Sequence, residues 1–276
     1  MLVSIFNQYG ALNSGPVFDA ISQGLFNIGI EYCYNNHDAD VAVIWSLLWA
    51  GRMAPNKAIF DQFQDSGRAV IVVEVGMISR GETWKISLWR NRQVFWGTEF
   101  VENRTKAIGL EAKPWRQAGR NIVVAAQRTD SEQWRGQPSM IDWINEVVKR
   151  IRTVSDRPII VRPHPRERLS VVQGVAMVTP TKLGGSYDSF DFHTVLSNAH
   201  LVVNWSSTPG VESILFGVPS VVGPNSMASV VGAGRLEDIE NPRRPDRTEW
   251  VRWLAHTEWR LCELQQGWWF KRLPLR

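Results

Sequence analysis

The chain has 276 residues, of which 44% are hydrophobic and 21% are charged. This composition is typical of a globular protein with a full core, and it excludes a disordered chain, a repeat array and a mini-scaffold. The formal net charge is +4, and 24 of the 31 basic residues are Arg. Because guanidinium groups pair well with phosphates, this bias hints at phosphate-bearing ligands, although a GC-rich genome also raises the Arg content.

No apolar run approaches the ~20 residues that a membrane span requires, and the N-terminus reads as a first strand rather than as a signal peptide. The two cysteines, Cys33 and Cys262, are too few for a disulfide framework and lack the spacing of metal ligands. We therefore expect a soluble protein of a reducing cytoplasm that has no membrane span and no metal site.

Strand and helix signals alternate in the first third of the chain. We expect strands at residues 2–7, 31–34, 41–45 and 69–75, with helices opening at Pro16 and near Pro55. Fully apolar strands between amphipathic helices are typical of a parallel sheet that is covered on both faces. The sequence predicts an α/β domain here.

From Ser79 to about Gly119 the alternation stops, and we expect a long irregular stretch with a domain boundary near its end. Between Arg80 and Arg120, nine basic residues stand against four acidic ones, with aromatic residues among them. Cationic and aromatic side chains together suit phosphate contacts and base stacking. The predicted contacts with an acceptor or a nucleic acid are Arg80, Lys85, Trp89, Arg90, Arg92 and Trp96.

A second α/β series follows. It predicts strands at residues 121–127, 158–162, 175–178, 201–204 and 220–222, with helices at 191–198, at 211–216 and after the capping residue Ser139. After Pro245 the chain reads as helical to its end. We therefore predict two doubly wound parallel-sheet domains, residues 1–115 and 116–276, the second closed by C-terminal helices.

The most specific segment begins where a strand ends at Asn204. A helix then starts at Pro209 or Gly210, and Glu212 lies one turn further on. The turn is filled by hydroxyl side chains, those of Ser206, Ser207 and Thr208. Hydroxyl donors and unpaired amides at a helix N-terminus predict a phosphate site, and Glu212 can accept hydrogen bonds from two ribose hydroxyls. The alternative is an ordinary helix cap, with Glu212 favouring the helix dipole.

A second motif, Arg162-Pro-His-Pro-Arg-Glu, ends another strand at the same sheet edge. Two prolines hold His164 in a rigid turn, and Arg162 and Arg166 add cationic donors. The imidazole can hold a phosphate oxygen and stabilise a departing nucleotide. A lone His is more often structural, but the flanking arginines favour a role in binding.

Together, the two motifs resemble the C-terminal, donor-binding domain of GT-B glycosyltransferases. The His-Pro motif and the serine turn are most similar to the bacterial sialyl- and Kdo-transferase groups, and Glu212 with Gly217 and Pro219 is a wider GT-B feature. The resemblance covers about residues 121–223, and the N-terminal half resembles the class in architecture only. It implies a GT-B-like fold with two Rossmann-like domains facing a cleft. It also implies that His164, Ser206, Ser207 and Thr208 hold the donor phosphates and that Glu212 holds the ribose.

The resemblance further implies a glycosyltransferase, hexosyl or related, that works without a metal or a cofactor. Its co-substrate would be a nucleotide sugar, a UDP-sugar in the first place or a CMP-sugar. An inverting enzyme needs a carboxylate base in the first domain. Glu74, in Val73-Glu-Val-Gly76, partly matches the acidic pair plus Gly of sialyltransferases, although Val75 replaces the second acid. Asp19 is the second candidate.

The two motifs do not identify the acceptor. A fainter similarity to glycosyltransferase-like proteins of tailed phages, with the basic stretch, leads to the hypothesis that the acceptor is a 5-hydroxymethylpyrimidine in duplex DNA, modified in the host cytoplasm. The alternatives are transfer to a saccharide, as in capsule or lipopolysaccharide synthesis, a UDP-sugar epimerase, and a non-catalytic nucleic-acid-binding module. The sequence does not indicate the oligomeric state.

Overall fold

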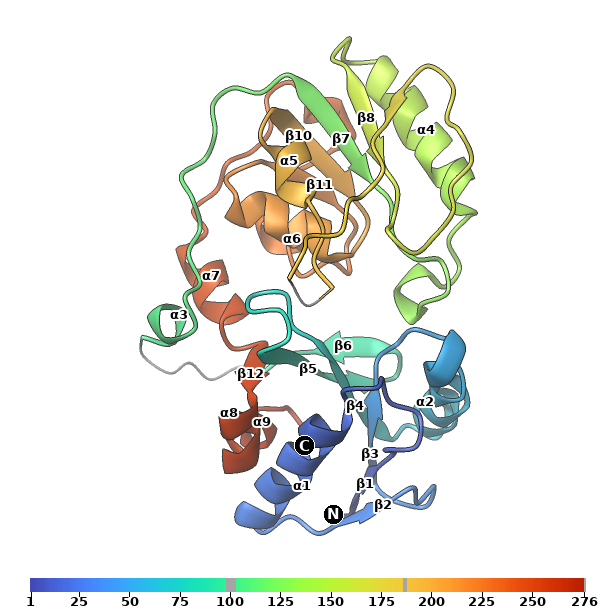
Figure 1. The fold of residues 1–276 in the computed structure, drawn as a ribbon, viewed down its shortest axis with the longest axis vertical. Coiled ribbons are helices and arrows are strands. Elements are labelled where there is room, and N and C mark those ends of the chain that lie inside the picture. The colour runs from blue at the N-terminus through green and yellow to red at the C-terminus, as the bar shows by residue number, and fades with distance from the viewer. Residues whose placement is uncertain (98–102, 186–187, 276) are drawn as a thin grey trace. The chain divides into compact units, whose positions relative to one another are not determined.

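The structure, a computed structural model, describes residues 1–97, 103–185 and 188–275 (Figure 1). The chain divides into two compact units. Unit 1 consists of Met1–Leu110, Asp130–Glu132 and Arg252–Arg276, and unit 2 consists of Glu111–Thr129 and Gln133–Val251. The prediction that the whole C-terminal region belongs with the second half is therefore wrong for the last 25 residues. Within the described ranges, no helix combines the length and the apolarity that crossing a bilayer requires.

Short apolar strands form the sheet of unit 1, in the order β12-β5-β4-β3-β1-β2 with β6 paired to β5. Strands β1 to β4 pair in parallel, whereas β5, β6 and β12 pair antiparallel to their neighbours. Their bounds are Val3–Ile5 (β1), Tyr32–Tyr34 (β2), Val41–Trp45 (β3), Ala69–Val75 (β4), Thr83–Arg90 (β5), Gln93–Phe95 (β6) and Glu258–Arg260 (β12).

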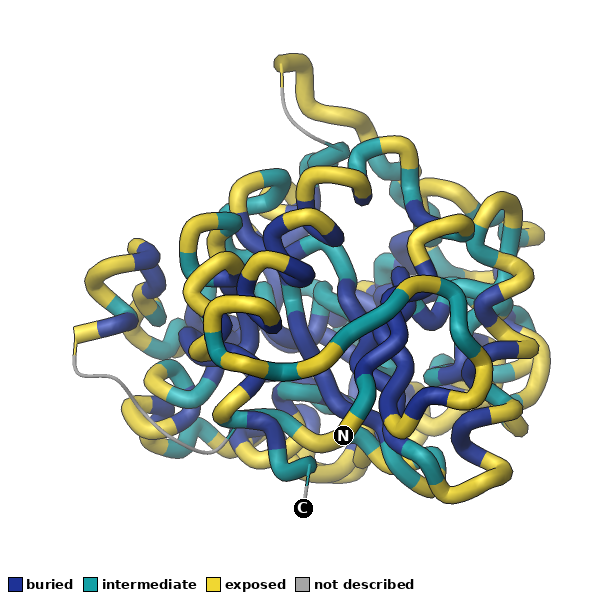
Figure 2. The backbone as a smooth tube through the Cα atoms, turned by 90° about the horizontal axis from the view of Figure 1, so that it is seen from below, coloured by how far each residue is buried: buried dark blue, intermediate teal, exposed yellow. Residues whose placement is uncertain are grey.

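Helices cover both faces of this sheet. Alternate residues of each strand face α1, α8 and α9 on one side and α2 on the other, where Phe60 and Phe63 enter the core. Figure 2 shows the buried strands in dark blue and the exposed turns in yellow. The helices are α1 (Gly15–Asn27), α2 (Asn56–Asp65), α3 (Arg104–Ala107), α8 (Leu261–Gln266) and α9 (Trp268–Lys271), with a 3₁₀ turn, η1, at Gly51–Met53.

The expectation of an irregular stretch from Ser79 to Gly119 is wrong, because β5 is the longest strand of unit 1. From Trp84 to Leu88 apolar and polar residues alternate, with Trp84, Ile86 and Leu88 in the core cluster beside α1 and with Lys85 and Ser87 on the α2 side, where Trp89 is also buried. This period of two predicts a strand.

The chain after Pro245 is not continuously helical either. α7 (Thr248–Leu254) ends before β12, whose middle residue Trp259 pairs with Trp84 of β5. The fully buried carboxylate of Glu258 accepts hydrogen bonds from the backbone N–H groups of Met77 (2.7 Å) and Ile78 (3.1 Å). A Cβ on Gly76 would lie 2.3 Å from Glu258 Oε2, so this glycine is required by close packing.

Unit 2 is built on five parallel strands in the order β11-β10-β7-β8-β9. α4 packs on one face of the sheet and α5 on the other. As predicted, Ser139 caps α4, accepting the N–H of Asp142 at 3.2 Å. The bounds are Asn121–Ala125 (β7), Ile159–Arg162 (β8), Ala176–Met177 (β9), Ala199–Asn204 (β10), Ser220–Val222 (β11), Met140–Arg152 (α4), Phe192–Leu196 (α5) and Thr208–Leu215 (α6), with 3₁₀ turns at Glu132–Trp134 (η2), Ser229–Val231 (η3) and Leu236–Asp238 (η4).

One buried arginine, Arg104, connects the C-terminal segment to the rest of unit 1. The guanidinium of Arg104 donates to the carbonyl oxygens of Ala255 (2.7 Å) and Glu258 (2.5 Å), pairs with the carboxylate of Glu263 and lies over the ring of Trp259. Burial acts to raise the pKa of Glu263, but the hydrogen bonds from Arg104 and from the Arg260 N–H, together with the two positive charges, lower that pKa overall. Such a group cannot be removed without leaving several acceptors unpaired.

We therefore expect Arg104→Met to lower the free energy of unfolding by about 3 kcal/mol, because the half-buried carboxylate of Glu263 loses its counter-charge and two backbone carbonyl oxygens lose their donor. The measurement is urea unfolding. The control is Arg150→Met, which breaks an exposed pair with Glu237 and is expected to lower the free energy by less than about 1 kcal/mol. Equal losses in the two variants would contradict the anchoring role of Arg104.

Candidate functional site

The carboxyl edge of the unit 2 sheet brings the two predicted motifs together. Parallel pairing aligns Arg162 of β8, Ala125 of β7 and Asn204 of β10 in one row. His164 lies two residues beyond Arg162, and Ser206 lies two residues beyond Asn204, so both lie past the ends of their strands at this edge. Because only β7 separates the two strands, their backbones are about 10 Å apart.

This edge is also the topological switch point of unit 2. The chain passes from β7 to β8 and β9 on one side, and then returns to β10 and β11 on the other. In open parallel sheets, ligands bind outside the carboxyl ends of the strands where the strand order reverses. The candidate site therefore lies just past the carboxyl ends of β7 and β10.

The serine turn has an unusual hydrogen-bond arrangement. Ser207 occupies the N-cap position of α6, but its side chain makes no capping hydrogen bond. Its Oγ instead accepts a hydrogen bond of 2.8 Å from Nδ2 of Asn204, which also donates to the carbonyl oxygen of Ala125 at 3.0 Å. The ordinary-cap alternative for Ser207 is thus not what the structure contains.

Gln127 is a site residue that the sequence did not reveal. It follows β7, it is only 4% exposed, and its Oε1 accepts the backbone N–H of Ser206 at 2.9 Å. Its Nε2 lies 3.2 Å from Ser206 Oγ. The only signal in the sequence is that Gln127 is a polar residue just past the buried strand β7. Its partner, Ser206, is 79 residues away.

The remaining predicted donor residues of this turn lie on α6. Thr208 is its first residue, and Glu212, which is half-buried, lies one turn further on. Gly210 permits the close approach of α6 to the sheet, because a Cβ there would lie 2.8 Å from Val222 Cγ1 and 3.1 Å from Asn204 Oδ1. Among the described residues, no group of three His, Cys, Asp or Glu side chains is arranged to hold a metal ion.

His164 is held by its own turn. Its Nδ1 accepts the backbone N–H of Arg166 at 3.1 Å, so the neutral ring carries its proton on Nε2. Arg166 forms an ion pair of 2.5 Å with Asp188. The imidazole is therefore oriented to donate through Nε2, as the binding of an anion requires.

Arg162, in contrast, has a structural position. Its buried guanidinium pairs with Asp191 and donates to the carbonyl oxygen of Thr179 at 3.2 Å. Burial acts to raise the pKa of Asp191, but hydrogen bonds from the Thr181 N–H and from Arg162 lower it. The prediction that Arg162 binds the donor is not supported by this position, because its fork is occupied within the fold.

In unit 1, Glu74 forms an ion pair with Lys85, its neighbour across the sheet (2.6 Å), and lies 3.5 Å from Ser46 Oγ. Ser46 follows β3 with a left-handed backbone (φ 64°), which is uncommon for a residue other than glycine. Asp19, the other candidate base, is an exposed residue of α1. Both carboxylates are thus accessible, but Glu74 already has a counter-ion.

The predicted acceptor contacts are mostly occupied within unit 1. Trp89 is buried and donates to Ser87 Oγ, so it cannot stack on a ligand without leaving the core. Arg90 donates to the carbonyl oxygen of Leu275 at 2.8 Å, and Trp96 packs edge to face against Trp253.

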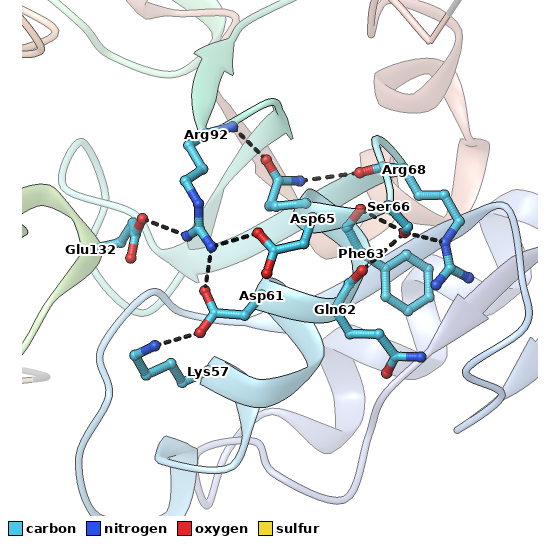
Figure 3. Close-up of polar contacts among 10 residues, drawn as sticks. Lys57, Asp61, Gln62, Phe63, Asp65, Ser66, Arg68, Arg92 and Glu132 are labelled. Atoms are coloured by element: carbon cyan, nitrogen blue, oxygen red, sulfur yellow. Dashed lines mark hydrogen bonds and ion pairs between the residues drawn. The ribbon is translucent and has the colours of Figure 1, made fainter.

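Arg92 is part of a network of acidic residues (Figure 3). It stands with a positive φ in the two-residue turn between β5 and β6, and it pairs with Asp61, Asp65 and Glu132 at 2.8–3.1 Å. Burial acts to raise the pKa of Asp61, but hydrogen bonds with Lys57 and Arg92 lower it. With Lys85 also paired, much of the basic charge of the stretch is neutralised within the fold.

 Arg80, in the turn between β4 and β5, is half-buried and also has an interaction partner in the fold, so no cation of the predicted set is unengaged.

Comparison with known proteins bears on the fold. No protein-family model and no curated protein sequence matches the chain. Among solved structures, it is similar to KpsC of Thermosulfurimonas dismutans, a beta Kdo 2,4 transferase, with a TM-score of 0.56 and 13% identity over 94% of this chain and 91% of that chain. The chain shares the fold of that transferase. A second KpsC structure, a beta Kdo 2,7 transferase, gives a TM-score of 0.47 and 14% identity over 93% of this chain and 89% of that chain. The first similarity is consistent with the predicted GT-B-like α/β fold.

The position of Arg162 leads to a testable expectation. Arg162→Met should lower the free energy of unfolding by about 3 kcal/mol, because Asp191 loses its counter-charge in a largely buried position. The double variant Arg162→Met with Asp191→Asn should recover part of this loss, as measured by urea unfolding. Unchanged stability combined with a complete loss of nucleotide binding would instead return Arg162 to the donor-binding set.

Proposed function

We propose that the chain is a glycosyltransferase that moves a sugar from a nucleotide sugar, bound at the carboxyl edge of unit 2, to a hydroxyl group of a saccharide. The observation that carries this proposal is the serine turn at the switch point, where Ser207 leaves its helix uncapped and is held by Asn204 instead. The fold shared with a Kdo transferase supports the same class of reaction.

The donor phosphates would be bound by hydroxyl and imidazole groups. Ser206, Ser207 and Thr208 supply O–H donors beside the N-terminus of α6, whose amides favour an anion. His164 supplies an Nε2–H from the far side of β7. These donors stabilise the charge that develops on the leaving nucleotide, so the proposed reaction needs no metal ion. Glu212 would accept hydrogen bonds from the ribose, and both UDP-sugars and CMP-sugars suit this set of residues.

A saccharide is the better acceptor proposal. The DNA hypothesis depended on the basic and aromatic stretch of unit 1, and its members are engaged in the fold: Arg92 by three carboxylates, Lys85 by Glu74, and Trp89 by the core. Paired cations release few counter-ions from a nucleic acid and so contribute little to its binding. The transferase whose fold the chain shares is a Kdo transferase, which favours sugar hydroxyls as acceptors.

In an inverting transfer, a carboxylate of unit 1 takes the proton of the acceptor hydroxyl. The hydroxyl oxygen then bonds to the anomeric carbon, and the bond from that carbon to the phosphate oxygen breaks, so that the nucleotide leaves with the electron pair. Glu74 is the first candidate for this base and Asp19 the second. Glu74 forms an ion pair of 2.6 Å with Lys85, so the acceptor hydroxyl would approach the carboxylate beside this ammonium group.

The donor site is tested by thermal unfolding with CMP, UDP and their sugars. A nucleotide that binds only the folded chain should raise the melting temperature. A free nucleotide concentration of 100 times the Kd adds about 2.7 kcal/mol to the free energy of unfolding. Ser207→Ala should remove most of this shift, and the exposed Ser229→Ala should retain it. Absence of a shift with every nucleotide would reject the proposal.

With the donor known, a labelled sugar is offered to a panel of saccharides and to duplex DNA that carries hydroxymethylpyrimidines. Label in a saccharide supports the proposal, whereas label in DNA alone restores the earlier hypothesis. Interconversion of the free nucleotide sugar with no acceptor would indicate an epimerase.

The base is tested by isosteric substitution. Glu74→Gln should lower kcat by about 10²- to 10⁴-fold while the affinity for the nucleotide stays unchanged, because only proton removal is lost. Asp19→Asn serves as the matched variant, measured in the same transfer assay. Near-normal turnover of Glu74→Gln, together with a large loss in Asp19→Asn, would move the role to Asp19.

A further inference from the structure

The hydrogen-bond direction at Ser207 is determined by its neighbours. Nδ2 of Asn204 faces both Ser207 Oγ (2.8 Å) and the carbonyl oxygen of Ala125 (3.0 Å). A carbonyl oxygen only accepts, so the atom that faces it must be the N–H₂ group. The opposite orientation of the amide would place two acceptors against each other. Ser207 Oγ is therefore an acceptor toward Asn204, and its own proton must point elsewhere.

The buried amide of Asn204 keeps this orientation although its oxygen, Oδ1, then makes no hydrogen bond to any described residue. The side chain is 1% exposed, and its Oδ1 has no hydrogen-bond partner among the described residues. A buried acceptor without a partner is destabilising. The two hydrogen bonds of Nδ2 thus determine how the amide is placed, and one of them goes to a hydroxyl that does not cap its helix.

Gln127 makes a similar arrangement at Ser206. Its Oε1 accepts the Ser206 N–H at 2.9 Å, which places Nε2 toward the hydroxyl, 3.2 Å from Oγ. The hydroxyl can also donate to Oε1 at 3.3 Å. When the proton of Ser206 turns toward an anion, Nε2 is in place to donate to the oxygen that remains.

We propose that Asn204 and Gln127 are positioning residues that turn the hydroxyl protons of Ser207 and Ser206 outward, as paired donors to the phosphate oxygens of a nucleotide. The inference rests on the proposed function and deepens it, because it explains why the turn selects an anion. A hydroxyl whose oxygen already accepts from an amide can use its proton only for an acceptor. The chemical class selected is a phosphate oxygen, which accepts and does not donate.

The test replaces each amide by the acid of the same shape. In Gln127→Glu and Asn204→Asp, the carboxylate accepts the serine proton and turns it inward. We expect the affinity for CMP or UDP, measured by calorimetry on the full chain, to fall by about 10- to 100-fold, as for the loss of a hydrogen bond to a charged group. Gln64→Glu is the matched control, since this amide of unit 1 is equally buried (4% exposed) and lies outside the site.

A double-mutant cycle separates hydrogen-bond direction from added charge. In a Ser206→Ala background there is no hydroxyl to turn. The loss of affinity that Gln127→Glu causes should therefore be about tenfold smaller there than in the wild-type background. A merely structural role of Gln127 would give equal losses in both backgrounds. The melting temperature of each variant shows whether it is folded. If Asn204→Asp does not fold, the Gln127 cycle alone tests the positioning role.

The outcomes are distinct. If the wild-type chain binds no nucleotide, the proposed function fails and this inference fails with it. If the wild-type chain binds a nucleotide and Ser207→Ala weakens binding, but the acid variants bind like the wild type or show equal losses in both backgrounds, the positioning role is overturned while the donor site stands.

Discussion

The alignment of three parallel strands, β8, β7 and β10, is the constraint on which the candidate site depends. Parallel strands end at one edge of a sheet, so two motifs about 40 residues apart in the chain reach the same edge. The buried apolar residues of these strands hold the alignment through packing on α4 and α5. A shift of one residue in the pairing of β10 with β7 would move Asn204 to the other face of the sheet and away from Ala125.

The distribution of arginine follows from the same packing. An Arg-rich composition suggests a surface that attracts phosphate, yet Arg92, Arg104 and Arg162 are each used inside a unit. The planar forks of Arg104 and Arg162 satisfy largely buried carboxylates and backbone carbonyl oxygens that would otherwise lack donors. The candidate groups for an anion at the edge of unit 2 are mainly neutral: three hydroxyls, an imidazole and the amides of α6.

The C-terminal segment gives unit 1 its final form. β12 extends the sheet beyond β5, and Glu258 holds the backbone of Met77 and Ile78 directly after β4. Gly76 is explained by this contact, so the part of the sequence that partly matches a sialyltransferase motif also has a packing requirement of its own. The placement of Glu74 at the end of β4 thus depends on residues at the other end of the chain.

Local patterns in the sequence were sufficient for most elements. Apolar runs bounded by turn residues predicted β4 and β11 with the bounds observed, and the capping residue of α4 was recognised from its hydroxyl. The alternation in β5 was present but overlooked, and nothing local indicated that Glu258–Arg260 would pair with β5 as a strand. The serine turn and the His-Pro turn were also recognisable, because their residue types and spacing are contained in short segments.

What the sequence by itself determined is therefore most of the strands and helices, although not β5 or β12, and the two turns with groups that suit a phosphate. The tertiary structure alone decided which side chains are used within the fold, as for Arg162 and Trp89, and which distant residues complete the site, as for Gln127 beside Ser206. The physical reason is that helix and strand signals arise from neighbours in the chain, whereas burial and hydrogen-bond partners depend on contacts between residues far apart in sequence.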